Sequence, residues 1–431
     1  MIERYTMPEM KKVWAVKNRF ELMLQIELYA CEAARDKGDI TAEIYDEIKA
    51  NAHFDLQRIV EIEEVTRHDV VAFLAAVGEN LGDLAKYVHK GLTASDILDT
   101  ALSVQMKQSA ELLLGKLYVL RDILVEKAKK YKYTLMVGRT HGMHAEPTTF
   151  GLKMALWIKE TDRCIERITS AKNTIAVGKM SGAVGNFANI DPFIEEHVCR
   201  RLGLKPEEVS TQIIQRDRHA YFINMLALVG STIEKFATEI RNLSRTDISE
   251  VDEPYTKGQR DSMGMPHKRN PVVTERLTGL SRILRGNALA AMEDISLWHE
   301  RDMTHSSVER IIIPDSCMLL DYMLDHMANV MRDLIVHADN MLANMEKTLG
   351  LLSSQRVFLA LMDHGVARET AYEWVKRNAL GAFENKMDFE YYILQDKDIM
   401  RIMSSEELDT LFDYDYCIKN VDYIFTRAGI E

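Results

Sequence analysis

The scarcity of proline limits what this chain can fold into more than any other feature. Its 431 residues contain eight prolines, and none lies between Pro8 and Pro147 or after Pro314. Proline ends or kinks a helix because it lacks the backbone N–H and clashes with the preceding turn. Very long helices are therefore permitted over most of the chain.

Apolar residues recur at helical spacing in two of the long stretches. Between residues 103 and 131 the steps are threes and fours, at Leu113, Leu117, Leu120, Leu124, Ala128 and Tyr131. Between residues 219 and 246 fours and threes alternate, at Phe222, Leu226, Val229, Ile233, Phe236, Ile240 and Leu243. Such a seam is typical of helices that pack nearly parallel or antiparallel. Strand signals are weak throughout, so the sequence predicts an all-α fold.

Charge and composition exclude several classes of protein. The net charge is -12, from 66 acidic and 54 basic residues, which argues against a general nucleic-acid surface. No apolar run is long enough to cross a bilayer, and the polar start "MIERYTMPEMKK" is no signal peptide. The five cysteines lack paired spacing, which indicates reduced thiols in a cytoplasmic protein, with neither a disulfide framework nor a metal cluster. An anionic ligand would need a local basic pocket.

Gly, Ser, Thr and Asn gather in connectors between the helical stretches, where the backbone turns and polar groups are presented. One boundary is expected near "GLTASD", where the first long helix begins, and another after Ala338, before a Met- and Leu-rich tail. We therefore predict a helical N-terminal domain, a central domain of long helices and a helical C-terminal domain. Their expected bounds are residues 1–93, 94–341 and 342–431.

The segment "DSMGMPHKRNP" gathers cations beside a serine in an acidic chain. Ser262 has small, flexible neighbours, so its loop can open and close. Asn270 and Pro271 are expected as the N-cap and first position of a helix, which places Lys268 at the positive helix end. Close to a lysine and helix-end amides, a serine alkoxide is less costly than it is in water.

Two histidines lie in the turn "GRTHGMHAEP". Glycines flank His141 and a proline closes the segment, so we expect a loop to present this side chain rather than a helix to bury it. Taken alone, it could equally be a histidine that fills hydrogen bonds within the loop. His144 shares its turn with Glu146, and we expect a structural role for it.

Three further connectors carry polar side chains that could bind an anion. His68 lies between Arg67 and Asp69, which can orient an imidazole, although such a trio is often a surface salt-bridge cluster. His89 precedes "KGLTASD", where Thr93 or Ser95 is a candidate helix cap with free amides beside it. The segment "HERDMTHSSVER" has the spacing of a phosphate or carboxylate clamp, and equally that of a solvated helix face; its candidate residues are Arg301, Ser306 and Arg310.

Together these segments resemble the fumarase/aspartase superfamily. "MPHKRNP" is similar to the end of the superfamily signature, usually written GSSxMPxKxNP. The stretches "RTHGMHAEPTTFG", "GKMSGAVGNFAN", "QRDRHAYF", "LWHERDMTHSSVER" and "SSQRVFLAL", with the start "MIERY", resemble the adenylosuccinate lyases within it. The similarity covers essentially the whole chain.

The resemblance implies a bundle of long central helices flanked by two smaller helical domains. It implies a homotetramer in which three subunits build each active site, and a small-molecule nucleotide substrate. The reaction implied is β-elimination of fumarate from adenylosuccinate to give AMP. The same site would split succinylaminoimidazole carboxamide ribotide (SAICAR) to AICAR. No metal or organic cofactor is implied.

By position, the resemblance also assigns roles to residues. Ser262 would be the general base that removes the proton next to the succinyl carboxylate. His141, supported by Glu275, would protonate the leaving nitrogen, and His68 would assist by binding the substrate. Lys268 would hold the carboxylate together with Asn270. The nucleotide phosphate and its surroundings would be bound by Arg4, Tyr5, Arg301, Ser306 and Arg310, and the pocket completed by Arg67, Asp69, His89, Thr93 and Gln212.

The chain departs from the family pattern at two places. The usual Gly-Ser-Ser-Ala is here Asp261, Ser262, Met263 and Gly264, and the usual Thr-Ser-x-Asp is here Thr93, Ala94, Ser95 and Asp96. Two alternatives therefore stay open: another fumarate-releasing lyase with a different substrate, and a non-catalytic scaffold on the same fold. "HERDMTHSSVER" argues against the first, and the retained catalytic candidates argue against the second.

Overall fold

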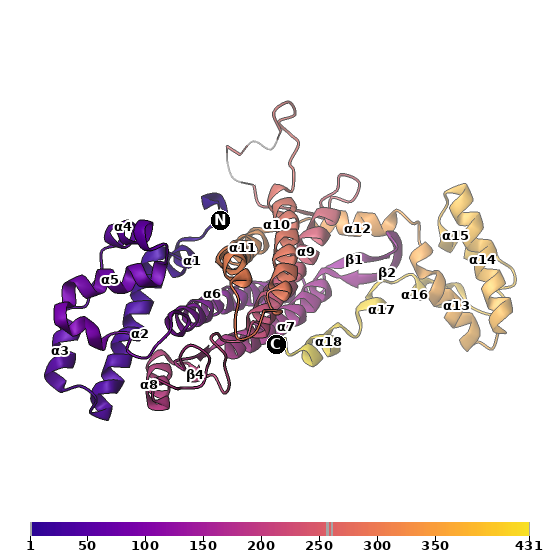
Figure 1. Cartoon of the computed structure of the whole chain (residues 1–431). Helices are drawn as coiled ribbons and strands as arrows, with labels where there is room; N and C mark the ends of the chain where they lie inside the picture. Colours follow the sequence, from indigo (N-terminus) through magenta and orange to yellow (C-terminus); the bar gives the residue numbers. More distant parts are fainter. Residues whose placement is uncertain (1, 256–257, 260–261, 431) are drawn as a thin grey trace. The chain divides into compact units, whose positions relative to one another are not determined.

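The computed structural model describes residues 2–255, 258–259 and 262–430, and most of these residues are helical (Figure 1). The fold class expected from the sequence is confirmed, with one addition. The described residues also form three two-stranded sheets, which the sequence did not predict.

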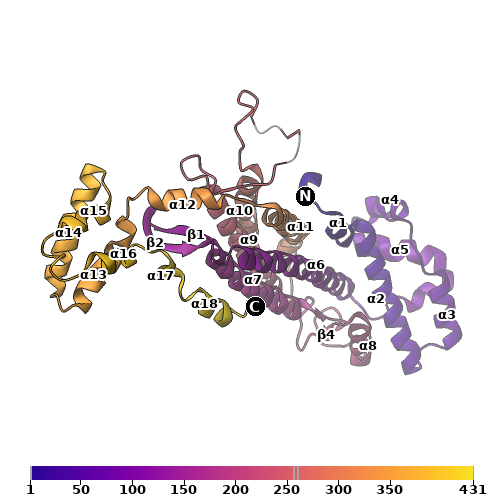
Figure 2. The ribbon, with the colours of Figure 1, turned by 180° about the vertical axis from the view of Figure 1, so that it is seen from behind.

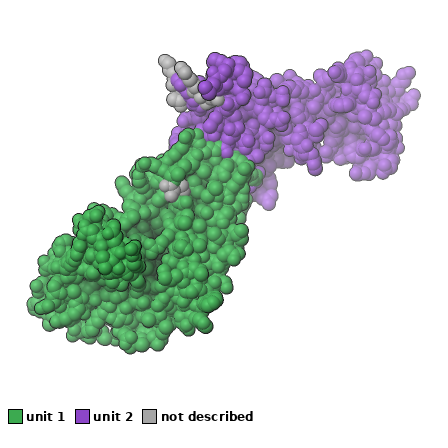
Figure 3. Space-filling view, turned by 45° about the horizontal axis from the view of Figure 1, so that its top comes forward, with its two compact units in different colours: residues 1–119, 163–235, 276–327 green, residues 120–162, 236–275, 328–431 purple. Residues whose placement is uncertain are grey.

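The chain divides into two compact units, which Figure 3 distinguishes by colour. Unit 1 comprises Met1–Val119, Arg163–Lys235 and Arg276–Met327, and unit 2 comprises Leu120–Asp162, Phe236–Glu275 and Ala328–Glu431. Five long helices contribute residues to both units: α6 (Ala94–Lys130), α7 (Phe150–Ile175), α9 (Asp217–Leu243), α10 (Val272–Glu293) and α11 (Thr304–Asp333).

The long helices lie side by side in both views of the ribbon (Figures 1 and 2). The predicted seam of α9 is buried along its whole length, with every member at most 3% exposed. Trp157 of α7 stacks on Phe236 of α9 with 4.4 Å between ring centroids. Where α9 meets α10, a Cβ on Gly230 would lie only 2.4 Å from Cδ1 of Leu284. The seam therefore packs helix against helix, as its spacing predicts.

The rest of unit 1 packs its other helices around an apolar core. Phe20 and Phe73 stack in this core with their ring centroids 5.6 Å apart. Its remaining elements are η1 (Glu3–Tyr5), α1 (Pro8–Val13), α2 (Val16–Lys37), α3 (Ala42–Asn51), α4 (Leu56–Thr66), α5 (Asp69–Leu81), η2 (Gly82–Tyr87), β3 (Val177–Gly178), α8 (Pro192–Leu202) and β4 (Lys205–Pro206).

The rest of unit 2 contains a hairpin, a short sheet and the C-terminal helices. Its remaining elements are β1 (Leu135–Thr140), β2 (Met143–Thr149), β5 (Val251–Asp252), β6 (Ile335–Val336), α12 (Ala338–Glu346), η3 (Leu351–Ser353), α13 (Ser354–Asp363), α14 (Arg368–Asn385), α15 (Phe389–Gln395), α16 (Ser405–Leu411), α17 (Asp415–Ile418) and α18 (Val421–Ala428). The C-terminal helices enclose a separate apolar core around Val357, Leu361 and Phe389.

The β1–β2 hairpin is the main difference from the all-helical expectation. Its two-residue turn is His141-Gly142, with φ of +56° and +78°. Two positive φ values are required by the type I′ turn, whose twist matches that of the strands it joins. Arg139 of β1 also pairs with the buried Glu250, at 2.6 Å between Nη2 and Oε1. The strands carry no clear apolar alternation, so local sequence did not reveal them.

Candidate active site

Unit 1 holds a cavity of about 380 Å³ into which several of the predicted side chains project. Part of its lining is apolar, from Trp14, Leu98 and Leu102, and part is polar. The polar lining includes Arg19, Ser95, Asp99, Arg216, Arg301, His305, Ser306, Glu309 and Arg310. Arg301, Ser306 and Arg310 of "HERDMTHSSVER" thus line one cavity, and their role in binding a substrate stays a prediction.

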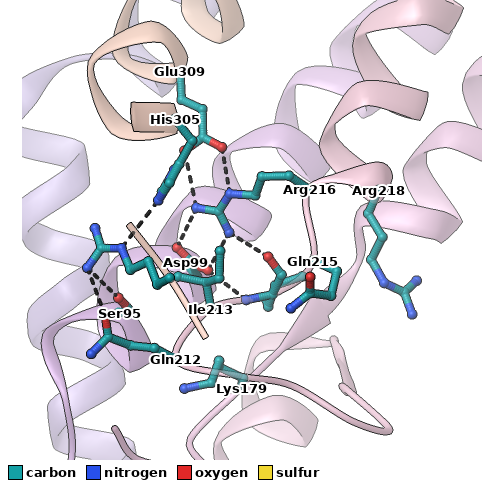
Figure 4. Close-up of polar contacts among 12 residues, drawn as sticks. Ser95, Asp99, Lys179, Gln212, Ile213, Gln215, Arg216, Arg218, His305 and Glu309 are labelled. Carbon is teal, nitrogen blue, oxygen red and sulfur yellow. Dashed lines mark hydrogen bonds and ion pairs between the residues drawn. The ribbon is translucent and has the colours of Figure 1, made fainter. Parts of the chain in front are cut away.

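The cavity lining carries a surplus of positive charge. Four arginines face two carboxylates, those of Asp99 and Glu309, and both carboxylates bond to Arg216. The Arg216 guanidinium is buried, with Nη1 2.6 Å from Asp99 Oδ2 and Nε 2.6 Å from Glu309 Oε1. Figure 4 shows Arg216 between these two acids. Arg216 is thereby neutralised, and the charge of Arg301 remains available to an anion.

Arg301 is held by side chains from two other segments of unit 1. Its Nη1 lies 3.2 Å from Ser95 Oγ and 3.2 Å from Gln212 Oε1. Gln212 and Arg301, predicted to share the substrate pocket, are therefore in contact. Ser95 was considered only as a helix cap, yet it lies within α6 with its hydroxyl directed to Arg301.

The turn between α4 and α5 presents the Arg67–Asp69 trio. Arg67 ends α4 with a φ of +55°, and His68 caps α5, its Nδ1 accepting from the Val71 amide at 3.4 Å. Asp69 bonds to Arg310 Nη2 at 2.8 Å. Burial opposes its ionisation, but the hydrogen bond and charge of Arg310 prevail and lower the pKa of Asp69. This contact brings two predicted pocket residues together.

His89 and Thr93 lie in the connector before α6. His89 has a φ of +58°, and its Nδ1 lies 2.6 Å from Glu27 Oε1. It lines a separate cavity of about 630 Å³, so the structure does not place it with Arg301. The Thr93 amide donates to Asp96 Oδ2 at 2.8 Å, which fits the predicted cap position at the start of α6.

Arg4 and Tyr5 both lie in η1, and Tyr5 is positioned by packing. Arg4 is exposed in η1, and the Tyr5 ring packs edge-on against Tyr322 with 5.3 Å between centroids. The Tyr322 hydroxyl accepts from Arg276 Nη1 at 2.8 Å. Tyr5 therefore rests on α11, the same helix that carries Ser306 and Arg310.

In unit 2, His141 is exposed at the tip of the β1–β2 hairpin, which confirms that a turn presents it. His144, its neighbour on β2, is half-buried and lies opposite Arg139. Burial and the charge of Arg139 lower the pKa of His144. The two histidines thus differ in their surroundings, and the structural role of His144 stays a prediction.

The serine loop is exposed from Met263 to Arg269, including Lys268. Ser262 is half-buried, and its Oγ accepts from the Met265 amide at 3.1 Å. Asn270 is half-buried and Glu275 is exposed in the first turn of α10. Asp261, the acidic departure from the family pattern, lies outside the described residues.

The start of α10 corrects one prediction. The helix begins at Val272, so Asn270 and Pro271 precede it rather than serving as N-cap and first residue. The amides of Val273 and Thr274 donate to the Glu253 carboxylate, at 3.1 and 2.6 Å. A carboxylate at this end is stabilised by the helix dipole. Glu253 was not identified from the sequence, because a cap from twenty residues away leaves no local pattern.

Neither a metal cluster nor a membrane span is found in the part of the chain that the structure describes. Within that part, no three His, Cys, Asp or Glu side chains are arranged to hold a metal ion. No helix there is long and apolar enough to cross a membrane.

Comparison with known proteins identifies the fold and the family of this chain. A model of the lyase family matches residues 3–286, and a model of the adenylosuccinate lyase C-terminus matches residues 350–428. A fumarate lyase from Mesorhizobium sp. BNC1 has the same fold, with a TM-score of 0.91 at 24% identity over 99% of both chains. The 3-carboxy-cis,cis-muconate lactonizing enzyme of Pseudomonas putida superposes with a TM-score of 0.89 at 26% identity, over 98% of this chain and 96% of that one. The fold and the lyase match define a member of the fumarase/aspartase superfamily.

Two curated relatives narrow the assignment. The adenylosuccinate lyase of Bacillus subtilis (strain 168) is 52% identical over 430 residues, and that of Staphylococcus saprophyticus is 52% identical over 431. In each case the similarity covers 100% of both chains. The chain belongs to the adenylosuccinate lyase family, and its activity is that of a lyase of this family.

Proposed function

We propose that the chain releases fumarate by β-elimination from adenylosuccinate, giving AMP, and from SAICAR, giving AICAR. The observation that carries this proposal is the cavity in unit 1, where Arg301 and Arg310 lie beside the neutralised Arg216. A site with surplus positive charge suits a substrate that carries a phosphate and two carboxylates. The full-length similarity to two adenylosuccinate lyases supports the same substrate.

In the proposed reaction, Ser262 removes the proton next to a succinyl carboxylate. The electrons of that C–H bond form the double bond of fumarate as the bond to the purine-side nitrogen breaks. His141, supported by Glu275, donates a proton to this nitrogen. The Met265 amide supports the role of Ser262, because a donor bonded to the oxygen stabilises its alkoxide.

The remaining residues would stabilise the negative charge that develops on the substrate or would bind the substrate. Lys268 and Asn270 would stabilise the carboxylate as the aci-carboxylate forms, and preorganised charge of this kind often supplies the largest share of catalysis. His68, Arg67 and Asp69 would bind the substrate beside the cavity. The nucleotide phosphate would contact Arg4, Tyr5, Arg301, Ser306 and Arg310, while His89, Thr93 and Gln212 would complete the pocket. No metal or organic cofactor takes part in these steps.

The proposal includes a cytoplasmic homotetramer whose sites combine residues from three subunits. It also includes the division into three domains, with bounds 1–93, 94–341 and 342–431. Exposed apolar side chains on the long helices support association, namely Leu156, Leu228, Ile283 and Leu289. Each is 47–59% exposed in the single chain. Association would bury large apolar side chains that are exposed in the single chain.

The direct test is an ultraviolet assay of adenylosuccinate cleavage, with fumarate release measured in parallel. Wild-type protein should cleave adenylosuccinate, while His141→Gln should keep its assembly state and lose several orders of magnitude in kcat. Near-wild-type turnover by His141→Gln would remove this residue from the mechanism.

Shared sites are tested by mixing inactive His68→Ala and Lys268→Ala proteins, because mixed tetramers should recover part of the activity. A complete lack of recovery in mixed tetramers would contradict active sites shared between subunits.

A further inference from the structure

His305 is a buried residue at the start of α11 that the proposed mechanism does not use. It is 2% exposed, and its ring contacts charged groups on both sides. Its Nε2 lies 3.2 Å from Nε of Arg301, and its Nδ1 lies 2.9 Å from Oε2 of Glu309. The imidazole therefore bridges a proposed substrate-binding arginine and a buried acid.

The partners fix which ring nitrogen carries the proton. The Nε–H of a guanidinium can only donate, so Nε2 of His305 must accept from Arg301. The proton then lies on Nδ1 and is donated to Glu309, which leaves the imidazole neutral. Burial opposes ionisation of Glu309, but the hydrogen bond from His305 and the charge of Arg216 lower its pKa to about 2. Glu309 is thus the charged acceptor that this tautomer needs.

The bridge is anchored in a network of charged side chains that also line the cavity. Figure 4 shows Glu309 between the His305 ring and Arg216. Arg216 in turn donates to both oxygens of Asp99, at 2.6 and 3.0 Å. Because Arg216 is one cation between two anions, Glu309 keeps the negative charge that accepts the Nδ1 proton of His305.

The network also restrains how Arg301 can point. Its contacts to Ser95, Gln212 and His305 use Nη1 and Nε. Among the described residues Nη2 has no hydrogen-bond partner. The guanidinium is planar, so fixing two of its nitrogens from three segments also sets the direction of the third.

We propose that His305 is a positioning residue, which as a neutral bridge between Glu309 and Arg301 directs the Arg301 guanidinium toward the phosphate of the substrate. The proposal rests on the proposed function only in taking Arg301 as a phosphate contact. His305 itself does not touch the reacting atoms. Its loss should therefore weaken phosphate binding and leave the chemical step nearly unchanged.

The test compares His305→Leu with wild type in KM and kcat for adenylosuccinate, and in competitive inhibition by AMP and by adenosine. Loss of a hydrogen bond to a charged group corresponds to about tenfold in binding. We expect KM and the AMP inhibition constant to rise about tenfold, with kcat within about threefold. Inhibition by adenosine, which lacks the phosphate, should change by less than about twofold. Equal losses for AMP and adenosine would overturn the proposal.

Two further variants separate this inference from the proposed function. Arg301→Gln should weaken AMP at least as much as His305→Leu does, and the double variant should be no worse than Arg301→Gln alone. If Arg301→Gln binds AMP normally, the phosphate role of Arg301 is wrong. If Arg301→Gln impairs AMP binding but His305→Leu does not, or if the two losses add, only the role of His305 is wrong.

Matched controls address a merely structural effect. His197→Leu replaces another buried histidine of unit 1, whose ring contacts Glu32 rather than the network around Arg216, and it should leave the AMP inhibition constant within about twofold. His305→Gln retains an amide acceptor for Arg301 and a donor for Glu309, so it should keep AMP binding within about threefold. If His305→Leu does not fold, His305→Gln decides: retained AMP binding supports the bridge, and binding as weak as that of Arg301→Gln contradicts it.

Discussion

Lys179 and Asp96 form an ion pair in which neither side chain is exposed, with Nζ 2.5 Å from Oδ1. Asp96 lies in the first turn of α6 and also accepts from the amides of Thr93, Ser181 and Gly182. Lys179 follows β3 in the segment "GKMSGAVGN". The buried Asp96 carboxylate thereby joins the connector before α6, which contains the proposed pocket residue Thr93, to the segment after β3.

Removal of Lys179 should be strongly destabilising. In Lys179→Met the buried Asp96 carboxylate loses the ammonium group that pairs with it. Breaking a buried ion pair in this way costs about 3–5 kcal/mol. Denaturant unfolding would measure this loss. Lys205→Met, at an exposed lysine of the same unit, should change the free energy of unfolding by less than about 0.5 kcal/mol. Adding Asp96→Asn to Lys179→Met should recover part of the loss, and an unchanged stability in Lys179→Met would refute the argument.

Two glycines of that segment should respond differently to alanine. Both have positive φ, +81° at Gly182 and +77° at Gly185. A Cβ on Gly182 would find Gly91 O at 3.7 Å, whereas one on Gly185 would lie 2.2 Å from Ser210 O. Both alanines meet the left-handed penalty of about 1–2 kcal/mol, and Gly185→Ala should lose about 1–3 kcal/mol more through the backbone clash.

Thermal and denaturant unfolding of Gly182→Ala and Gly185→Ala would compare these losses. Because Ser210 precedes Gln212 in the chain, Gly185→Ala should also raise KM for adenylosuccinate more than Gly182→Ala does. Equal stability of the two variants would show that the Ser210 carbonyl moves away freely.

The long helices were predictable because burial along them follows the apolar spacing. The residues of the α9 seam repeat every three or four positions and are all buried, so one local pattern determines both helix and packing. The β1–β2 hairpin was not predictable in this way. Its strands carry no clear apolar alternation, and Arg139 pairs with Glu250, 111 residues further along the chain.

The candidate site also combines residues from one local motif with residues that are distant in the sequence. Arg301, Ser306 and Arg310 stand in one motif, but their spacing alone fits a solvated helix face equally well, and only the family resemblance groups them as a predicted site. Residues that support them are distant in sequence: Ser95 reaches Arg301 across 206 positions. Such contacts depend on tertiary packing, so a single sequence holds no local signal for them.

Glu253 should stabilise the start of α10. Glu253→Ala removes the acceptor for the amides of Val273 and Thr274, and loss of a helix cap costs about 0.5–2 kcal/mol. Glu253→Gln keeps one carbonyl acceptor, so its loss should be smaller. Chemical denaturation and kcat/KM for adenylosuccinate would be measured on both, since α10 follows the proposed catalytic loop. Equal effects of alanine and glutamine would argue against capping.

His219 should make stability depend on pH in weakly acidic solution. Its side chain is 3% exposed, and burial, with the charge of Arg216, lowers the pKa of His219 to about 4. The unfolded chain therefore binds the proton more readily than the folded one. Stability is fully present above the unfolded pKa of about 6.5 and is lost as pH falls from there toward the folded pKa. The slope for one proton is about 1.4 kcal/mol per pH unit.

The free energy of unfolding of wild type and His219→Leu should be compared between pH 5 and pH 7.5. Glu309 does not interfere in this window, because its lowered pKa keeps its contribution intact above the ordinary range of glutamate. Wild type should lose about 2 kcal/mol relative to His219→Leu between pH 6.5 and pH 5, and no such difference should appear above pH 7. The exposed His53 provides the control, since His53→Leu should follow the wild-type curve. Parallel curves for wild type and His219→Leu would mean that His219 binds its proton equally well in the folded and unfolded chain.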